Sequence, residues 1–82
     1  MNQAIQFPDR EDWDEIRQAV CFPVIVNGFQ LTCGITRKAL CQRFGEGEPL
    51  VLFRANRWDL EDQAQELLED HQEDEQGWVW LS

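Results

Sequence analysis

The chain has 82 residues, of which 43% are hydrophobic, and it carries four Trp, five Phe and a formal net charge of −9. This composition excludes a disordered chain, and the length predicts one domain over residues 1–82 that buries about 60–65% of the surface of its unfolded chain. The N-terminus has neither the basic start nor the apolar segment of a secretory signal, and no apolar run approaches the ~20 residues that span a bilayer. We therefore expect a cytoplasmic protein that does not associate with membranes.

The first element is a weak strand candidate at residues 4–7, and an acidic run from Asp9 to Glu15 follows it. The run resembles a calcium loop only in charge, because it lacks the central glycine and the final glutamate of an EF-hand. We expect a solvated turn in which Trp13 folds back on the sheet, and no metal site.

The next element is a β-hairpin over residues 19–35, centred on Asn27-Gly28. This pair tolerates the positive φ angles of a two-residue type I′ turn, which sets the cross-strand register. The register places four apolar pairs on one face, and this face is the predicted core: Val26–Phe29, Val24–Leu31, Phe22–Cys33 and Val20–Ile35. Pro23 has no N–H for a ladder, so its strand is expected at a sheet edge or with a bulge.

Two helices are predicted after the hairpin. Thr36 can cap a helix over residues 37–44, which Gly45 ends. After a loop at residues 45–49, apolar residues at three- and four-residue spacing predict a helix over about residues 50–72, with room for a kink near Arg57.

Residues 78–81 have the pattern of a closing strand. The chain is therefore expected to be an α+β fold, in which a small antiparallel sheet of the hairpin, the C-terminal strand and the N-terminal strand is covered on one face by the two helices.

No catalytic, cofactor or metal site is expected. The single histidine, His71, lies on the apolar stripe near the C-terminal end of the second helix, where we expect it to interact with the helix dipole or to pack its ring and not to act in catalysis. Cys21, Cys33 and Cys41 are odd in number and lack C-x-x-C spacing, so we expect them to be reduced and structural. Carboxylates in the loop at residues 45–49 would repel phosphate, which argues against nucleotide binding.

Charge is distributed unevenly along the chain. Residues 37–57 hold five basic and two acidic residues, whereas residues 58–82 hold nine acidic residues and no Lys or Arg. Like charges four residues apart destabilise a helix, so local stability does not explain this acidity. It serves either to keep the protein in solution or to dock a basic partner.

A second surface feature is a flank of the long helix on which Val51, Arg54 and Trp58 follow one another. Trp and Arg are favoured interface anchors, but Trp58 could equally pack against a sheet edge. The candidate interaction residues are therefore Arg54, Trp58, Glu66, Asp70 and Glu73.

Segments spread over nearly the whole chain resemble one known family. They are residues 1–11 (MNQAIQFPDRE), Val20-Cys-Phe-Pro23, Val26-Asn-Gly28, Gln30-Leu-Thr-Cys33, Arg43-Phe44, Arg57-Trp-Asp-Leu-Glu61 and Gln76-Gly-Trp-Val-Trp-Leu81. The resemblance is to the enterobacterial YrdB-like family of small bacterial domains of unknown function. It implies a bacterial α+β domain and supplies no activity and no catalytic residue.

The leading functional hypothesis is a non-enzymatic accessory domain that binds another protein. The alternative is nucleic-acid binding through the basic segment 37–57, or an acidic domain that mimics nucleic acid. Direct binding of nucleic acid is disfavoured, because the acidic helix opposes the field that phosphates require and can pair with the basic side chains.

Overall fold

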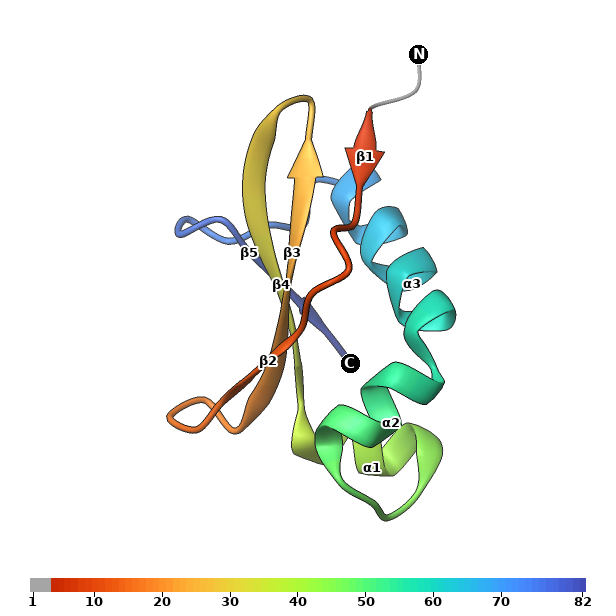
Figure 1. The fold of residues 1–82 in the computed structure, drawn as a ribbon. Helices are drawn as coiled ribbons and strands as arrows, with labels where there is room; N and C mark the ends of the chain where they lie inside the picture. Colours follow the sequence, from red (N-terminus) through yellow and green to blue (C-terminus); the bar gives the residue numbers. More distant parts are fainter. Residues whose placement is uncertain (1–3) are drawn as a thin grey trace.

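The structure, a computed structural model, describes residues 4–82 as a five-stranded sheet with three helices on one of its faces (Figure 1). The elements in chain order are β1 (Ile5–Gln6), β2 (Asp12–Asp14), β3 (Ala19–Val26), β4 (Phe29–Thr36), α1 (Arg37–Phe44), α2 (Pro49–Ala55), α3 (Arg57–Glu69) and β5 (Trp78–Leu81). Both β1 and β2 pair with β3, and β4 and β5 follow across the sheet. The expected α+β class is confirmed.

The central hairpin has the predicted turn and register. Asn27 and Gly28 have φ angles of 52° and 87°, as a type I′ turn requires. All four predicted cross-strand pairs form. The core lies between this face and the helices, and its largest fully buried side chains include Phe22, Phe53 and Ile35. Phe29 was expected in the core but is 75% exposed, so the apolar face continues along the hairpin beyond the core.

Pro23 lies in an interior strand whose register with β4 is continuous, which corrects the expected position at a sheet edge or a bulge. On the side of β3 away from β4, β2 pairs with residues 19–21 and β1 with residues 25–26. The N–H of Asn27 donates to the carbonyl of Ala4 on that side, and alternate residues of a strand direct their N–H groups to the same side. The nitrogen of Pro23 therefore faces the gap between β1 and β2, where no ladder bond is lost.

The sheet is mixed, which corrects the expected antiparallel arrangement. β5 is parallel to β4, with Thr32 opposite Trp78 and Ile35 opposite Leu81. Parallel neighbours need a long crossover connection, usually a helical one. Here α1, α2 and α3 return the chain to the end of the sheet where β4 begins (Figure 1), so the last strand must run in the same direction.

Two helices, α2 and α3, replace the single helix expected over residues 50–72, and they meet next to Arg57, where a kink was expected. The break is at Asn56, whose side-chain amide donates to the carbonyl of Leu52 at 2.9 Å. Asn competes in this way with the helical ladder of the backbone. Helix α3 ends at Glu69, because His71 adopts a left-handed conformation (φ 55°). The N–H of the next residue, Gln72, donates back to the carbonyl of Leu67.

The acidic segment 9–15 is also more ordered than expected. Residues 12–14 form β2, an additional strand paired with β3, where the expected structure was a solvated turn. Trp13 faces the core side, as expected, and packs against the hydrophobic cluster. The strand forms because Trp13 lies opposite the buried Val20, while Asp12 and Asp14 occupy the other face of the sheet.

Candidate functional site

The residue types most often used in catalysis are dispersed in this fold. His71 is exposed at the end of α3, not on the buried stripe where the sequence placed it, and its side chain makes no hydrogen bond within residues 4–82. Burial raises the pKa of the Cys33 thiol to about 12 and is also the main reason that the pKa of Cys21 is raised. A thiol with a raised pKa is a poor nucleophile.

Residues 4–82 hold no group of three or more His, Cys, Asp or Glu side chains that could bind a metal ion. In the same range, no helix combines the length and the apolar character that a membrane crossing needs.

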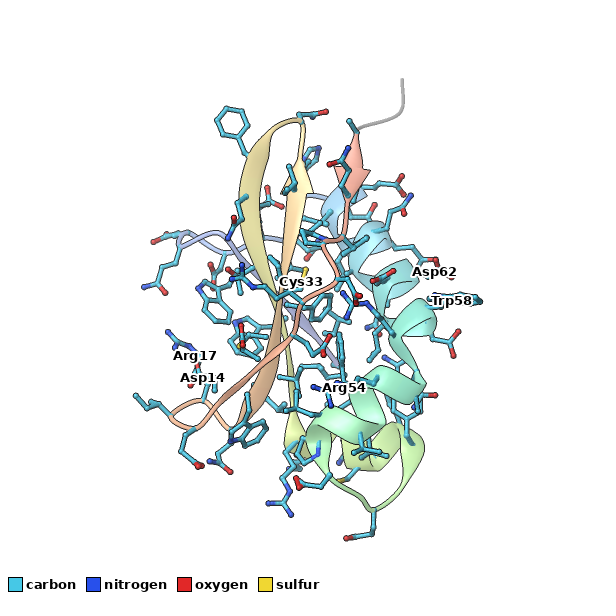
Figure 2. The ribbon with its side chains drawn as sticks, viewed as in Figure 1. Asp14, Arg17, Cys33, Arg54, Trp58 and Asp62 are labelled. Atoms are coloured by element: carbon cyan, nitrogen blue, oxygen red, sulfur yellow. The ribbon has the colours of Figure 1, made fainter. Side chains whose placement is uncertain are left out.

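The most distinctive surface feature is Trp58, whose side chain is 83% exposed in the first turn of α3. Figure 2 shows the indole directed away from the sheet, on the same side of the helix as Asp62. Trp58 therefore does not pack against a sheet edge, which was one of the two expectations from the sequence. We call the exposed side of this helix the outer face of α3; its residues are Trp58, Asp59, Asp62, Gln65, Glu66 and Glu69.

Arg54 does not share this face with Trp58, although sequence spacing placed them together. Its Nε donates to Oε2 of Glu11 at 2.8 Å, so the side chain turns toward the N-terminal segment (Figure 2). Both residues border a hollow of about 370 Å³ at the α2–α3 junction, which is lined by residues 54–59. Of the candidate pair, only Trp58 is free to act as an anchor.

An ion-pair cluster at this junction was missed by the sequence analysis. Arg57 donates to Oε1 of Glu11 at 2.5 Å, to Oε2 of Glu61 at 2.7 Å and to the carbonyl of Pro8 at 2.7 Å. Its guanidinium also lies 5.4 Å from the ring centre of Phe53. The partners Glu11 and Arg57 are 46 positions apart, so no local sequence pattern could have revealed the contact.

The cluster anchors residues 8–11 to the helices. The side chain of Glu11 is only 14% exposed. The hydrogen bond from Arg54 is the largest of the influences that hold the pKa of Glu11 below its usual value, and Arg57 acts in the same direction against the effect of burial. Arg54 and Arg57 are thus occupied within the molecule, but only Arg57 pairs with the acidic helix as expected, through Glu61; the partner of Arg54 is Glu11 in the N-terminal segment.

The other candidate residues, Glu66, Asp70 and Glu73, are all exposed. Glu66 belongs to the outer face of α3, Asp70 is the C-cap residue of α3, and Glu73 lies in the connection from α3 to β5. None of the three forms an ion pair with Lys or Arg in the range 4–82. Their charge is therefore not neutralised by the fold.

The uncovered face of the sheet carries a second aromatic group that sequence reasoning did not single out. Trp78 and Trp80 stack with ring centres 5.1 Å apart, and the guanidinium of Arg17 lies 4.5 Å from the ring centre of Trp78. Trp78 and Trp80 alternate along β5 with the buried Val79 and Leu81, so their stack covers part of the sheet face on which no helix packs.

Residues 5–81 match the family described as "Protein of unknown function (DUF1488)". The chain belongs to the DUF1488 family. Two relatives named "Uncharacterized protein YrdB", from Escherichia coli strain K12 and from Shigella flexneri, are each 57% identical over 84 residues, with 99% of this chain and 99% of the relative covered.

A solved structure of a DUF1488 protein supports the fold. The crystal structure of a family member from Shewanella loihica PV-4 has a TM-score of 0.91 and 32% identity, and the match covers 99% of this chain and 94% of that one. The resemblance drawn from the sequence is therefore confirmed for family and fold, and the family is one of unknown function.

Proposed function

We propose that this DUF1488 domain is a non-enzymatic protein-interaction module, which docks a basic surface of another protein against the outer face of α3. The observation that carries the proposal is Trp58, a large aromatic side chain that is 83% exposed on a helix face otherwise formed by acidic and amide groups. Trp is the residue type most enriched among interface hot spots.

The exposed indole has a specific energetic meaning. Its contact with water is unfavourable in the free protein, and a partner that covers it gains about 25 cal/mol for each Å² of apolar surface removed from water. Isolated surface aromatics are tolerated in many proteins. Here the indole borders the hollow at residues 54–59, into which a partner side chain can insert.

The acidic residues of this face favour a partner with positive charge. Asp62 and Glu66, and Glu66 and Asp70, are like-charge pairs four residues apart, and each costs about 0.2–0.5 kcal/mol of helix stability. A basic partner would remove this repulsion on binding and would be steered toward the face by its field. Charge thus favours association and selectivity, while Trp58 provides the apolar anchor.

Direct nucleic-acid binding through segment 37–57 receives less support. Arg54 and Arg57 are engaged by Glu11 and Glu61, and Arg43 donates to Gln63 and to the carbonyl of Ser82. Few cations of the segment are left to neutralise successive phosphates, which is what gives such proteins their affinity. Mimicry of nucleic acid by the acidic face is a special case of the proposal, in which the basic partner is itself a nucleic-acid-binding protein.

The proposal is tested by affinity purification of the tagged protein, expressed at native level in an Escherichia coli strain that lacks its own YrdB, with and without nuclease. Trp58→Ala removes the anchor, and Phe29→Ala is the matched control because Phe29 is also a large exposed aromatic. We expect a basic, nuclease-resistant partner that Phe29→Ala retains and Trp58→Ala loses.

Charge-reversal variants provide a second test in the same affinity purification. The variant Glu66→Lys/Asp70→Lys/Glu73→Lys should lose the same partner, whereas Asp12→Lys/Glu46→Lys/Glu48→Lys, with an equal change of net charge on other exposed residues, should keep it. A partner that survives both the Trp58 change and the first triple reversal would show that α3 is not the docking surface.

A further inference from the structure

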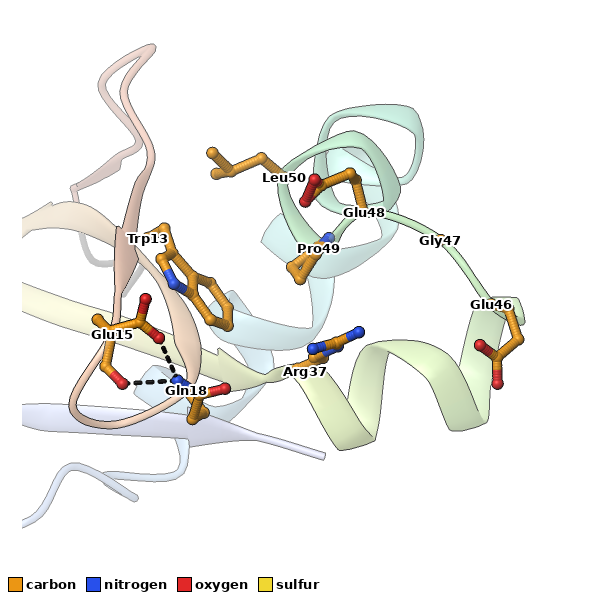
Figure 3. Close-up of a pocket in the computed structure, with 9 residues that line it drawn as sticks. All are labelled: Trp13, Glu15, Gln18, Arg37, Glu46, Gly47, Glu48, Pro49 and Leu50. Carbon is orange, nitrogen blue, oxygen red and sulfur yellow. Dashed lines mark hydrogen bonds between the residues drawn. The ribbon is translucent and has the colours of Figure 1, made fainter.

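A groove on the opposite part of the molecule from the hairpin turn is independent of the α3 surface. It consists of two hollows, each of about 500 Å³, that share Gln18, Arg37 and Glu46. One wall is the β2–β3 turn and the other is the α1–α2 loop with the first turn of α2. Figure 3 shows Arg37 pointing into this space between the two walls.

Arg37 is an unpaired cation in this groove. Within residues 4–82 its guanidinium makes no ion pair, no side-chain hydrogen bond and no stacking contact with an aromatic ring. By contrast, Arg43, Arg54 and Arg57 are all bonded to other residues of the fold. Arg37 therefore remains available to a ligand in a chain whose formal net charge is −9.

The two halves of the groove differ in chemistry. The first is basic, with three cations and one carboxylate among its lining residues: Arg17, Gln18, Thr36, Arg37, Lys38, Cys41 and Glu46. Arg17 forms an ion pair with Asp14 at 3.0 Å, whereas Arg37 and Lys38 form no ion pair with any of the described residues 4–82. The hydroxyl oxygen of Thr36 accepts the N–H of Ala39, so this hydroxyl can still donate its own hydrogen to an anion.

The second half is apolar in the middle and acidic at its rim. Trp13 forms one side, and Pro49 and Leu50 form the other (Figure 3). Glu15, Glu46 and Glu48 also line this half, and their charges repel an anion there. An anionic group is thus directed to Arg37 and Lys38, while a neutral, flat or apolar group fits beside Trp13.

We propose that this groove binds a small organic anion, with its phosphate or carboxylate on Arg37 and Lys38 and its planar or apolar body between Trp13 and Pro49. Guanidinium groups bind phosphate and carboxylate through two parallel hydrogen bonds, and an aromatic wall adds stacking for a planar body. The site lies apart from the outer face of α3, so it adds a ligand to the domain and does not depend on the protein partner.

The test is a titration of the full chain with 1-naphthyl phosphate as the probe. Binding is followed through the amide and indole N–H signals in ¹⁵N NMR. We expect shifts confined to residues 13–18, 36–41 and 46–50, including the indole signal of Trp13, which a Trp13→Phe variant assigns. Inorganic phosphate should shift only the signals near Arg37, and more weakly. 1-Naphthol, which lacks the anion, should bind at least about tenfold more weakly than the phosphate.

Three single variants distinguish binding in the groove from non-specific attraction of the anionic probe to positive charge. Arg37→Gln should weaken the probe by about tenfold or more, Lys38→Gln should weaken it less, and Arg10→Gln, an exposed cation outside the groove, should leave affinity unchanged. Because the side chain of Arg37 makes no ion pair and no hydrogen bond within residues 4–82, the variant's spectrum should retain its dispersion. Unchanged affinity in Arg37→Gln, equal binding of 1-naphthol, or no shift at millimolar probe would each overturn the proposal.

Discussion

The indole of Trp80 lies against the backbone of Gly34, on the face of the sheet that the helices leave uncovered. A Cβ at residue 34 would come within 2.6 Å of Cζ3 of this indole, which is closer than real contacts allow. Trp80 also stacks on Trp78, so its ring cannot move away without losing that contact. Glycine at this position is therefore a packing requirement of the aromatic stack.

Replacing Gly34 by alanine should destabilise the protein by about 1–3 kcal/mol, the usual cost of overpacking. Urea unfolding of Gly34→Ala measures this loss. In a Trp80→Ala background the ring is absent, so the same glycine change should cost clearly less. An equal loss in both backgrounds would show that the contact with Trp80 is not its cause.

Glu11→Gln should lower the free energy of unfolding near neutral pH by about 1–3 kcal/mol, because charge-assisted bonds from Arg54 and Arg57 are weakened. The folded pKa of Glu11 is lowered, so its carboxylate stabilises the fold above the unfolded pKa, and this contribution disappears as pH falls through the folded value.

The pH dependence can be measured by urea unfolding of both proteins between about pH 7 and pH 3. The difference in stability between wild type and Glu11→Gln should shrink toward the acidic end. A difference that stays constant over this range would contradict the role assigned to the Glu11 carboxylate.

His71→Gly should stabilise the protein by about 0.5–1 kcal/mol. His71 ends α3 in the left-handed region (φ 55°), which glycine adopts without the steric cost that a Cβ imposes. Thermal unfolding of His71→Gly gives the change, and Gln72→Gly is the control, since that residue has no positive φ. A destabilised His71→Gly variant would argue against this helix ending.

Asp74 stabilises the turn that leads into β5. Its carboxylate accepts the N–H groups of Gln76 and Trp78 at 2.9 Å, and its own N–H donates to the carbonyl of Trp78 at 2.8 Å. Asp74→Ala should destabilise the protein by about 1–2 kcal/mol, although it removes one charge from an acidic segment. Glu75→Ala, which removes the same charge next to it, should be neutral or slightly stabilising; equal effects of the two variants would exclude a structural role for Asp74.

The parts of the fold that sequence reasoning predicted depend on local information. The Asn27-Gly28 turn and the alternation on either side of it are sufficient to give the register, and with it Phe22 and Ile35 in the core. The direction of β5 depends on where three helices return the chain, which no pattern within residues 78–81 contains.

For the candidate site, the sequence predicts which residue types are present but not which of their side chains are exposed. Acidity after residue 58 is visible in the sequence, but helical spacing alone could not decide whether a neighbouring element covers Trp58. The ion pair between Glu11 and Arg54 separates Arg54 from that face, and these partners are 43 positions apart. Long-range contacts of this kind decide which of the candidate side chains remain free.

The most direct test of docking at the outer face of α3 is photo-crosslinking in living cells, with p-benzoylphenylalanine in place of Trp58 and, as the control, in place of Phe29. Docking at this face predicts a specific crosslink to a basic protein from position 58, none to that protein from position 29, and loss of the crosslink when Glu66, Asp70 and Glu73 are changed to Lys. A position 58 that captures no protein, or a crosslink that survives the charge reversal, would contradict it.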